Sequence, residues 1–148
     1  MKKRYLWRQL VGSSLLLLAV AGCGDKLTAP TGSTISISPD SFSPPADSST
    51  TTSTHSQYFT ISLKDGDGKP LKNRQISIFF PYAVPDSSSY AQLYDGSTPK
   101  NSPFTSATNM DGVYYLRIDY LSGGGVTYTG NLEIRSGSVF ASATITVS

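Results

Sequence analysis

The amino-acid sequence predicts an all-β fold, an antiparallel β-sandwich of seven or eight short strands. From Ser33 onward, no stretch repeats apolar residues at the three-to-four spacing of a helix, and Gly, Pro, Ser and Thr interrupt every stretch. Alternation of apolar and polar residues with a period of two recurs instead. Strands with one apolar face bury that face by packing sheet against sheet. A closed barrel is the alternative architecture.

The alternation locates each strand in turn. Ile35 and Ile37 alternate with hydroxyl-bearing residues until Pro39, for example, and the last strand alternates in the same way up to Val147. The run 40–56 is rich in Ser, Thr and Pro and is expected to be a loop or a second tether. The expected strands are 34–38, 59–64, 75–80, 90–94, 104–108, 114–120, 126–134 and 139–147.

Charge is distributed unevenly along the 148 residues, which carry 12 basic and 10 acidic side chains. Four of the basic residues lie within the first nine positions, and no acidic residue precedes Asp25. Removing those four from the 12 leaves eight basic against 10 acidic residues, a net charge of −2. The apparent basicity therefore belongs to an N-terminal address, and no nucleic-acid partner is expected.

The N-terminal region has the pattern of an export signal. Its apolar stretch 10–22 would span about 20 Å as a helix, too short for the roughly 30 Å core of a bilayer. The stretch ends in Val20-Ala21-Gly22-Cys23, which resembles the lipobox of bacterial lipoproteins. The resemblance implies cleavage before Cys23 and acylation of its sulfur by fatty acids such as palmitate. An ordinary secretory signal with a chance Cys is the alternative.

The lipobox resemblance implies an organisation for the whole chain. A signal peptide would occupy residues 1–22, a lipidated tether 23–33 and the sandwich domain 34–148. Gly24, rather than an aspartate, follows Cys23, and in bacterial lipoproteins this favours the outer membrane. The resemblance thus predicts a covalent lipid that anchors the domain to the cell envelope; whether it faces the surface or the periplasm is open.

Two motifs resemble bacterial Ig-like domains of the invasin and intimin type. The segment from Phe59 to Leu71 contains an alternating strand followed by Asp65-Gly66-Asp67-Gly68-Lys69-Pro70, similar to the hairpin of those domains. Thr108-Asn109-Met110-Asp111-Gly112 is similar to their turn before a later strand. The resemblance implies an Ig-like sandwich over roughly 57–147, and an adhesion-like role.

The turn chemistry of the first motif can be read directly. The carboxylate of Asp65 is suited to cap the turn, Gly68 to supply a positive φ, and Pro70 to fix the exit. In an Ig-like topology, the turns 65–70, 109–112 and 136–138 would lie at one end of the sandwich, with the N-terminal segment. The loops 40–56, 81–89 and 123–125 would lie at the other end.

Catalytic constellations are not evident. His55 is the only histidine and falls in the expected loop, Cys23 is the only cysteine and is assigned to the lipid, and Glu133 is the only glutamate. One imidazole and an acylated thiol cannot form a catalytic triad or a zinc site. We therefore expect a protein that is not an enzyme and needs no cofactor beyond its covalent lipid.

The aspartates of the turns also suggest a weak calcium site. Asp65 and Asp67 with their glycines resemble the start of an EF-hand loop, but Ile76 stands where that loop needs its glutamate. A turn explains these residues better. Weak calcium binding by Asp65, Asp67 and Asp111 is the alternative.

An aromatic group in the middle of the chain is a candidate partner surface. Tyr82, Tyr90 and Tyr94 lie near Phe79, and tyrosine suits interfaces because it offers apolar area and a hydroxyl. Rings that fill the edges of the sandwich explain these residues better, and a partner surface is the alternative. Alternation places Phe79 opposite Ile76, Ile78 and Phe80, so it is either covered by 81–103 or exposed.

These expectations combine into a functional hypothesis. The chain would be a lipid-anchored, non-catalytic Ig-like module of the bacterial envelope, with a binding or structural role. Its partner could be an envelope protein, a filament or a polysaccharide. An accessory subunit of a periplasmic, outer-membrane or secretion assembly is the alternative.

Overall fold

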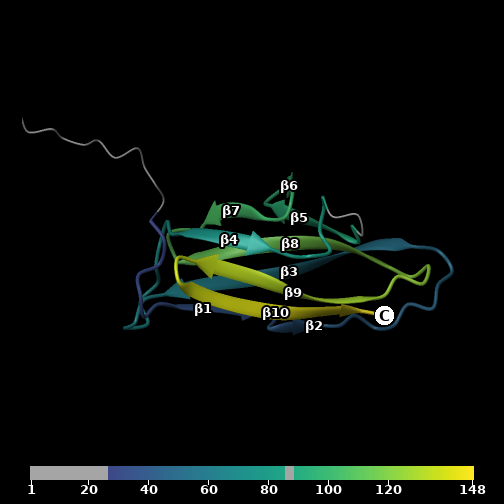
Figure 1. The fold of residues 1–148 in the computed structure, drawn as a ribbon, viewed down its shortest axis with the longest axis horizontal. Helices are drawn as coiled ribbons and strands as arrows, with labels where there is room; N and C mark the ends of the chain where they lie inside the picture. The colour runs from purple at the N-terminus through teal and green to yellow at the C-terminus, as the bar shows by residue number, and fades with distance from the viewer. Residues whose placement is uncertain (1–26, 86–88) are drawn as a thin grey trace, which may run out of the picture.

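The computed structural model describes residues 27–85 and 89–148 as two stacked five-stranded β-sheets (Figure 1). Residues 1–26, which include the expected signal peptide and Cys23, lie outside the described residues. Within the described ranges no helix is long and apolar enough to cross a membrane. The strand order of sheet A is β1(Thr34–Ser38), β3(Ser53–Lys64), β8(Val113–Ser122), β5(Ala91–Asp95) and β6(Thr98–Lys100). The strand order of sheet B is β2(Ser41–Phe42), β10(Val139–Val147), β9(Tyr128–Ser136), β4(Gln75–Phe79) and β7(Phe104–Ala107).

The predicted fold class is confirmed, since the described chain is an all-β, Ig-like sandwich. All eight expected strands are present, and two more were missed. The missed strands, β2 and β6, have two and three residues, too few for alternation to be recognised. β2 pairs with β10 in parallel, the one departure from antiparallel pairing among the strands described.

The run 40–56 is not purely a loop, contrary to expectation. It contains β2, and β3 begins at Ser53, several residues before the apolar alternation starts. The first residues of β3 are polar, but they pair in register with β8, where His55 lies opposite Tyr120. His55 is therefore a strand residue. Its neighbours carry no alternating apolar signal because this end of the strand is exposed.

The core lies between the two sheets and is built from the residues that alternation assigned to the inner faces. On β3, Phe59, Ile61 and Leu63 are fully buried while Tyr58 points to solvent. Because alternate residues of a strand point to opposite faces, each strand contributes every second side chain to this layer. The other large, fully buried side chains are Ile76, Ile78, Phe80, Leu93, Leu116, Ile118, Leu132, Ile134 and Ile145.

The turns 65–70, 109–112 and 136–138 meet at one end of the sandwich, as predicted; we call this the turn end. The Leu63 amide donates to the Gly112 carbonyl at 2.9 Å, so the two Ig-like motifs lie side by side. Thr108 is buried and joins them, because its hydroxyl donates to the Leu71 carbonyl at 2.6 Å and accepts from the Arg74 amide at 3.0 Å. The motifs therefore assemble one structural unit.

The described part of the expected tether, residues 27–33, packs on this turn end. Ala29 is buried, and its amide donates to the Ser136 hydroxyl at 2.8 Å. That hydroxyl donates in turn to the Gln75 carbonyl at 2.5 Å, and the Gln75 amide donates to the Leu27 carbonyl at 3.1 Å. The chain is therefore attached to the sandwich from Leu27 onward.

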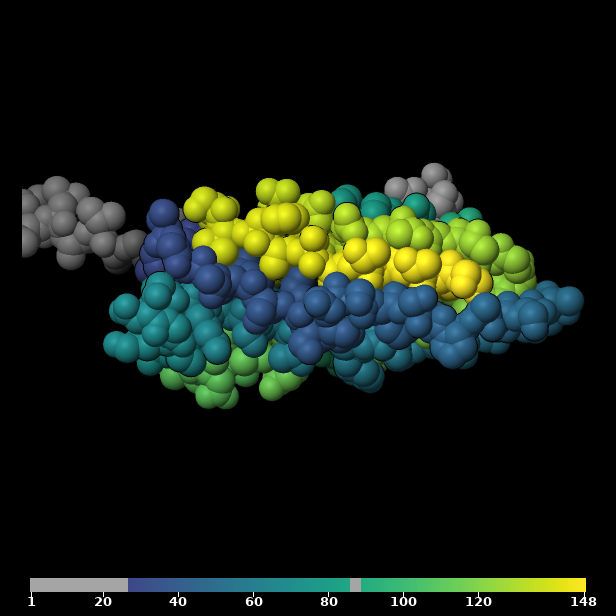
Figure 2. Space-filling view, turned by 90° about the horizontal axis from the view of Figure 1, so that it is seen from below, coloured from purple at the N-terminus to yellow at the C-terminus, as the bar shows by residue number. Residues whose placement is uncertain are grey.

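The opposite end, which we call the loop end, is formed by residues 43–52 and 123–125. The Gly124 amide donates to the Ser49 carbonyl at 2.8 Å, and the Asp47 amide donates to the Ser148 carbonyl at 3.2 Å. Figure 2 shows the blue segment 43–52 projecting past the yellow C-terminal strand, at the far end from the purple residues that begin the described chain. The two ends thus lie at opposite ends of the long axis of the molecule (Figure 1).

Candidate binding surface

The outer face of sheet A carries two of the most exposed aromatic side chains. Tyr58 on β3 is 64% exposed and Tyr115 on β8 is 63% exposed. The register pairs Tyr58 with Arg117 and Thr60 with Tyr115, so the two tyrosines are diagonal neighbours on one face. Both point outward because their sequence neighbours Phe59 and Tyr114 occupy the inner face.

Arg117 on β8 lies opposite Tyr58, and its side chain contacts two residues, Tyr94 and Asp119. Its guanidinium stacks over the ring of Tyr94 on β5, 3.8 Å from the ring centroid. Its Nε forms an ion pair with Oδ1 of Asp119 at 3.1 Å, and that oxygen also accepts from the Ser56 hydroxyl at 2.6 Å. Arg117 is therefore fixed, and its charge is balanced by the carboxylate. We call Tyr58, Tyr94, Tyr115, Arg117 and Asp119 the tyrosine face.

A shallow hollow of about 230 Å³ adjoins the tyrosine face beside β5. Gln92, Tyr94 and Asp119 line its outer side, and the Gln92 amide nitrogen donates to the Lys100 carbonyl at 2.8 Å. The tyrosine face thus combines ring faces, hydroxyls, an amide and one neutralised ion pair. Such a surface can bind a partner by stacking and hydrogen bonding but shows no net charge to attract an ionic one.

Of the aromatic residues singled out in the sequence, Tyr94 lies on the tyrosine face. Tyr82 and Tyr90 are not part of that face, although Tyr90 also lines the adjoining hollow. Their rings are half-buried and pack on the ring of Tyr128, at centroid distances of 4.8 and 5.5 Å. These two tyrosines fill an edge of the sandwich, which is the interpretation that the sequence favoured.

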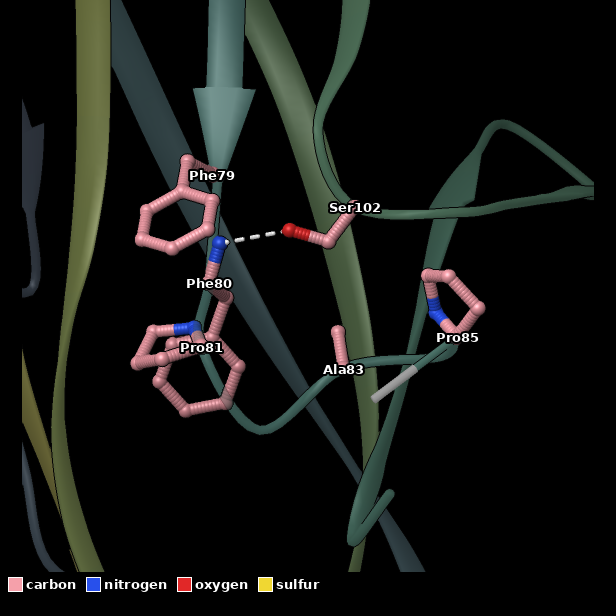
Figure 3. Close-up of a pocket in the computed structure, with 6 residues that line it drawn as sticks. All are labelled: Phe79, Phe80, Pro81, Ala83, Pro85 and Ser102. Carbon is pink, nitrogen blue, oxygen red and sulfur yellow. Dashed lines mark hydrogen bonds between the residues drawn. The ribbon is translucent and has the colours of Figure 1, made fainter. Parts of the chain in front are cut away.

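Phe79 lies on the outer face of sheet B and is 40% exposed. It borders a hollow of about 240 Å³ together with Phe80, Pro81, Ala83, Pro85 and Ser102 (Figure 3). The Phe80 amide donates to the Ser102 hydroxyl at 2.9 Å, which holds Ser102 beside the strand end. The described residues of 81–103 that line this hollow therefore lie close to Phe79 and leave its ring partly open to solvent.

Asp65 acts as the turn cap that the sequence predicted. Its Oδ1 accepts from the amides of Asp67 at 3.0 Å and Lys69 at 2.9 Å, and Gly68 has a φ of 80°. Asp111 belongs to the neighbouring turn, where its amide donates to Oδ1 of Asn109 at 2.9 Å. In the described ranges, no group of three or more His, Cys, Asp and Glu side chains could hold a metal ion. The hydrogen bonds that Asp65 and Asn109 accept from amides of their own turns support the turn interpretation.

Three residue types of a hydrolytic triad meet at the loop end, which sequence reasoning did not foresee. His55 and Ser122 line one hollow with Asp47. The Ser122 hydroxyl donates directly to Oδ2 of Asp47 at 2.9 Å, and the His55 ring stacks on Tyr120 at 5.6 Å between centroids. A triad needs the imidazole between the hydroxyl and the carboxylate. This arrangement therefore ties down a loop and lacks the order that activates a nucleophile.

Tyr58 and Tyr115 are the surface residues that the sequence analysis missed. Their signal was present, because each is a large aromatic side chain on the polar side of an alternating strand. Clustering along the chain drew attention to Tyr82 and Tyr90 instead. Neighbours within a sheet are set by strand order, which sequence proximity does not show.

Strand order, layers and this surface define the protein as an Ig-like β-sandwich with one tyrosine-bearing outer face. No protein-family model matches the chain, and no curated protein matches it. Among solved structures, it is similar to WR4, a member of the C. elegans MSP family, with 8% identity and a TM-score of 0.46, covering 77% of this chain and 97% of that one. It is also similar to PapD-like domain 7 of human CEP192, with 11% identity and a TM-score of 0.41, covering 88% and 94%.

Proposed function

We propose that this protein is a lipid-anchored, non-catalytic Ig-like module of the bacterial cell envelope that binds a partner through its tyrosine face. The observation that carries the proposal is the pair of highly exposed tyrosines, Tyr58 and Tyr115, beside an immobilised arginine on a rigid sheet. Tyrosine offers large contact area at low conformational cost, and strands hold it more rigidly than loops do.

The envelope part of the proposal is supported by the N-terminal sequence. The basic start, the short apolar stretch and Val20-Ala21-Gly22-Cys23 resemble a lipoprotein signal, and Gly24 favours the outer membrane. Two or more acyl chains on Cys23 would give stable anchoring. Loss of membrane fractionation in a Cys23→Ala variant is the expected result, and a variant that still sediments with membranes would refute the anchor.

The binding surface is tested by crosslinking in cells. A photoreactive phenylalanine analogue placed at Tyr58 or Tyr115 is expected to form a specific adduct, and one at Phe140 on sheet B is the control. Phe140 is 47% exposed, so it reports random collisions from the opposite face. The adduct at position 58 should disappear when Tyr115 and Arg117 are changed to Ser. Equal adducts at all three positions would refute the tyrosine face as the binding site.

The same cells distinguish an exposed module from an accessory subunit of a periplasmic assembly. Protease treatment of intact cells is expected to remove a surface-exposed domain and to spare a periplasmic one. Digestion of glycan in the crosslinked material separates a polysaccharide partner from a protein partner, because only the former loses the adduct.

A further inference from the structure

The N-terminal segment constrains where the domain lies relative to a lipid anchor. The chain is attached to the turn end from Leu27 onward, through the Gln75 amide and, two residues later, through the Ser136 hydroxyl. Leu27 is only four residues after Cys23. Four residues span at most about 14 Å even when fully extended.

That reach is short compared with the domain. β3 has 12 residues, and a strand of that length extends about 40 Å. An acylated Cys23, which is part of the proposed function above, lies at the boundary of the bilayer. The headgroup region of one leaflet is about 5–7 Å thick, so it takes up much of the available 14 Å. The turn end must then lie at the membrane surface, whereas the loop end need not.

The turn end also carries the two most exposed large hydrophobic side chains in the described chain. Leu27 is 66% exposed and Met110 is 65% exposed. Both lie at the start of β4, because Gln75 donates to the Leu27 carbonyl and the Asn73 side chain contacts the Met110 sulfur at 3.8 Å. Exposed apolar side chains beside a short anchor are suited to the interfacial region of a bilayer.

The charged side chains at this end do not oppose such contact. Lys64, Lys69 and Lys72 are exposed, and so are Asp67 and Asp111. The mixture contains slightly more positive than negative charge. It therefore tolerates neutral lipid and is weakly attracted to anionic lipid.

We propose that the turn end rests on the lipid surface, with Leu27 and Met110 among the headgroups, so that the sandwich stands on its end and projects the loop end away from the membrane. The tyrosine face runs along the long axis and stays open to partners in this orientation. A domain lying flat on the outer face of sheet A would instead place Tyr58 and Tyr115 against the lipid. The two orientations predict opposite protection of these residues.

The test uses the full protein purified with its lipid and placed in vesicles of phosphatidylethanolamine and phosphatidylglycerol. Cys23 is the only cysteine, so an acylated protein accepts a nitroxide at one introduced thiol: Met110→Cys, Tyr58→Cys or Ser49→Cys. We expect the label at 110 to be several-fold less accessible to a water-soluble nickel relaxant than the labels at 58 and 49. Protection of the label at 58, or equal exposure of all three, overturns the end-on orientation.

Two controls separate this inference from the proposed function. A mass spectrum that shows no acyl chains on Cys23, with no flotation of the protein on vesicles, refutes the anchor and the orientation together. A lipidated protein that floats but shows equal exposure at all three labels refutes the orientation alone. In the labelled Ser49→Cys protein with Leu27→Ser and Met110→Ser added, we expect a broader distribution of distances from the loop end to the bilayer. Phe79→Ser, at an exposed site on sheet B further from the turn end, should leave that distribution unchanged.

Discussion

The two ends of the sandwich are closed by different kinds of contact. At the turn end, each side chain that caps a turn bonds to amides within a few residues of itself: Asp65 to Asp67 and Lys69, and Asn109 to Asp111 and Val113. At the loop end, the Asp47 carboxylate also accepts from the nearby Ser49 amide, but the contacts that fasten the loop to the sandwich join residues far apart in sequence. The Asp47 carboxylate accepts from the Ser122 hydroxyl at the end of β8, and the Asp47 amide donates to the Ser148 carbonyl. The position of Asp47 therefore depends on residues that come much later in the chain.

This difference predicts different stabilities for the two ends. The turn end is continuous with the core, because Thr108 is buried and Gly112 is hydrogen-bonded to Leu63 of β3. The loop end is an exposed segment held by a few polar contacts, so it can open while the sandwich stays folded. Changes at the turn end should therefore lower global stability, and changes at the loop end should alter local protection.

The largest effect is expected from Gly112→Ala. Gly112 has a φ of 71°, and an added Cβ would lie 2.8 Å from the Leu71 nitrogen and 2.9 Å from the Leu63 carbonyl oxygen. Strain and the backbone clash together should cost about 3 kcal/mol of unfolding free energy or more, measured by urea denaturation. Gly68→Ala is the matched control, since its φ is 80° but no atom lies within 4 Å, and it should cost about 1 kcal/mol. Equal losses would show that the two motifs do not pack as described.

A somewhat smaller effect is expected from Thr108→Val. The substitution keeps the shape of the side chain but leaves the Leu71 carbonyl and the Arg74 amide without their partner. Leaving buried polar groups unpaired should cost about 2–3 kcal/mol in the same denaturation experiment. Thr105→Val, at an exposed position on the edge strand β7, should change stability little. A Thr108→Val variant as stable as the parent would contradict the linking role of this hydroxyl.

At the loop end, Gly124→Ala should act locally. Gly124 has a φ of 60°, and an added Cβ would lie 2.5 Å from the Thr52 hydroxyl oxygen, which would push the loop from its site. We expect faster hydrogen exchange throughout 43–52 with a global stability loss of only about 1 kcal/mol. Gly125→Ala is the matched control, because Gly125 has a φ of 78° but no atom lies within 4 Å of an added Cβ. Hydrogen exchange in 43–52 should therefore stay as slow as in the parent protein. Global unfolding by Gly124→Ala would remove the distinction between the two ends.

The smallest effect concerns the pH dependence of the loop end. The Asp47 carboxylate accepts hydrogen bonds from the Ser49 amide, which has the larger effect, and from the Ser122 hydroxyl. Both bonds hold its pKa below the usual 3.8. A lowered folded-state pKa stabilises the docked loop at pH values above 3.8, and this stabilisation is lost as pH falls through the folded-state pKa. Hydrogen exchange in 43–52 should therefore accelerate in acid before the core opens. Asp47→Asn should remove this pH dependence; if it persists in that variant, another group is responsible.

Alternation was enough to locate all eight longer strands, because each strand contributes one apolar face to a single core. It failed where that signal is weak: at the two- and three-residue strands and at the polar beginning of β3. Turn chemistry was equally readable at Asp65 and Gly68, since the interacting groups lie within four residues of one another.

The candidate surface was less predictable. Tyr94 was singled out, but Tyr58 and Tyr115 become its neighbours only because β3 and β8 pair in sheet A. Tyr82 and Tyr90 looked equivalent to Tyr94 in the sequence, yet they pack on Tyr128, which follows them by 46 and 38 residues. A run of tyrosines shows that rings are present and does not show which of them meet solvent.

The sequence by itself determined which segments alternate as strands, which side of each strand faces the core, and the chemistry of the short turns. These features depend on residues within a few positions of one another. It also supplies Cys23 and the signal-like residues before it, on which the anchor proposal depends. Only the tertiary structure decided which strands are neighbours, and hence the tyrosine face, the docking of 43–52 on the glycine turn and the attachment of Leu27 at the turn end. Those features join residues from distant parts of the chain, and only the packed sheets bring them together.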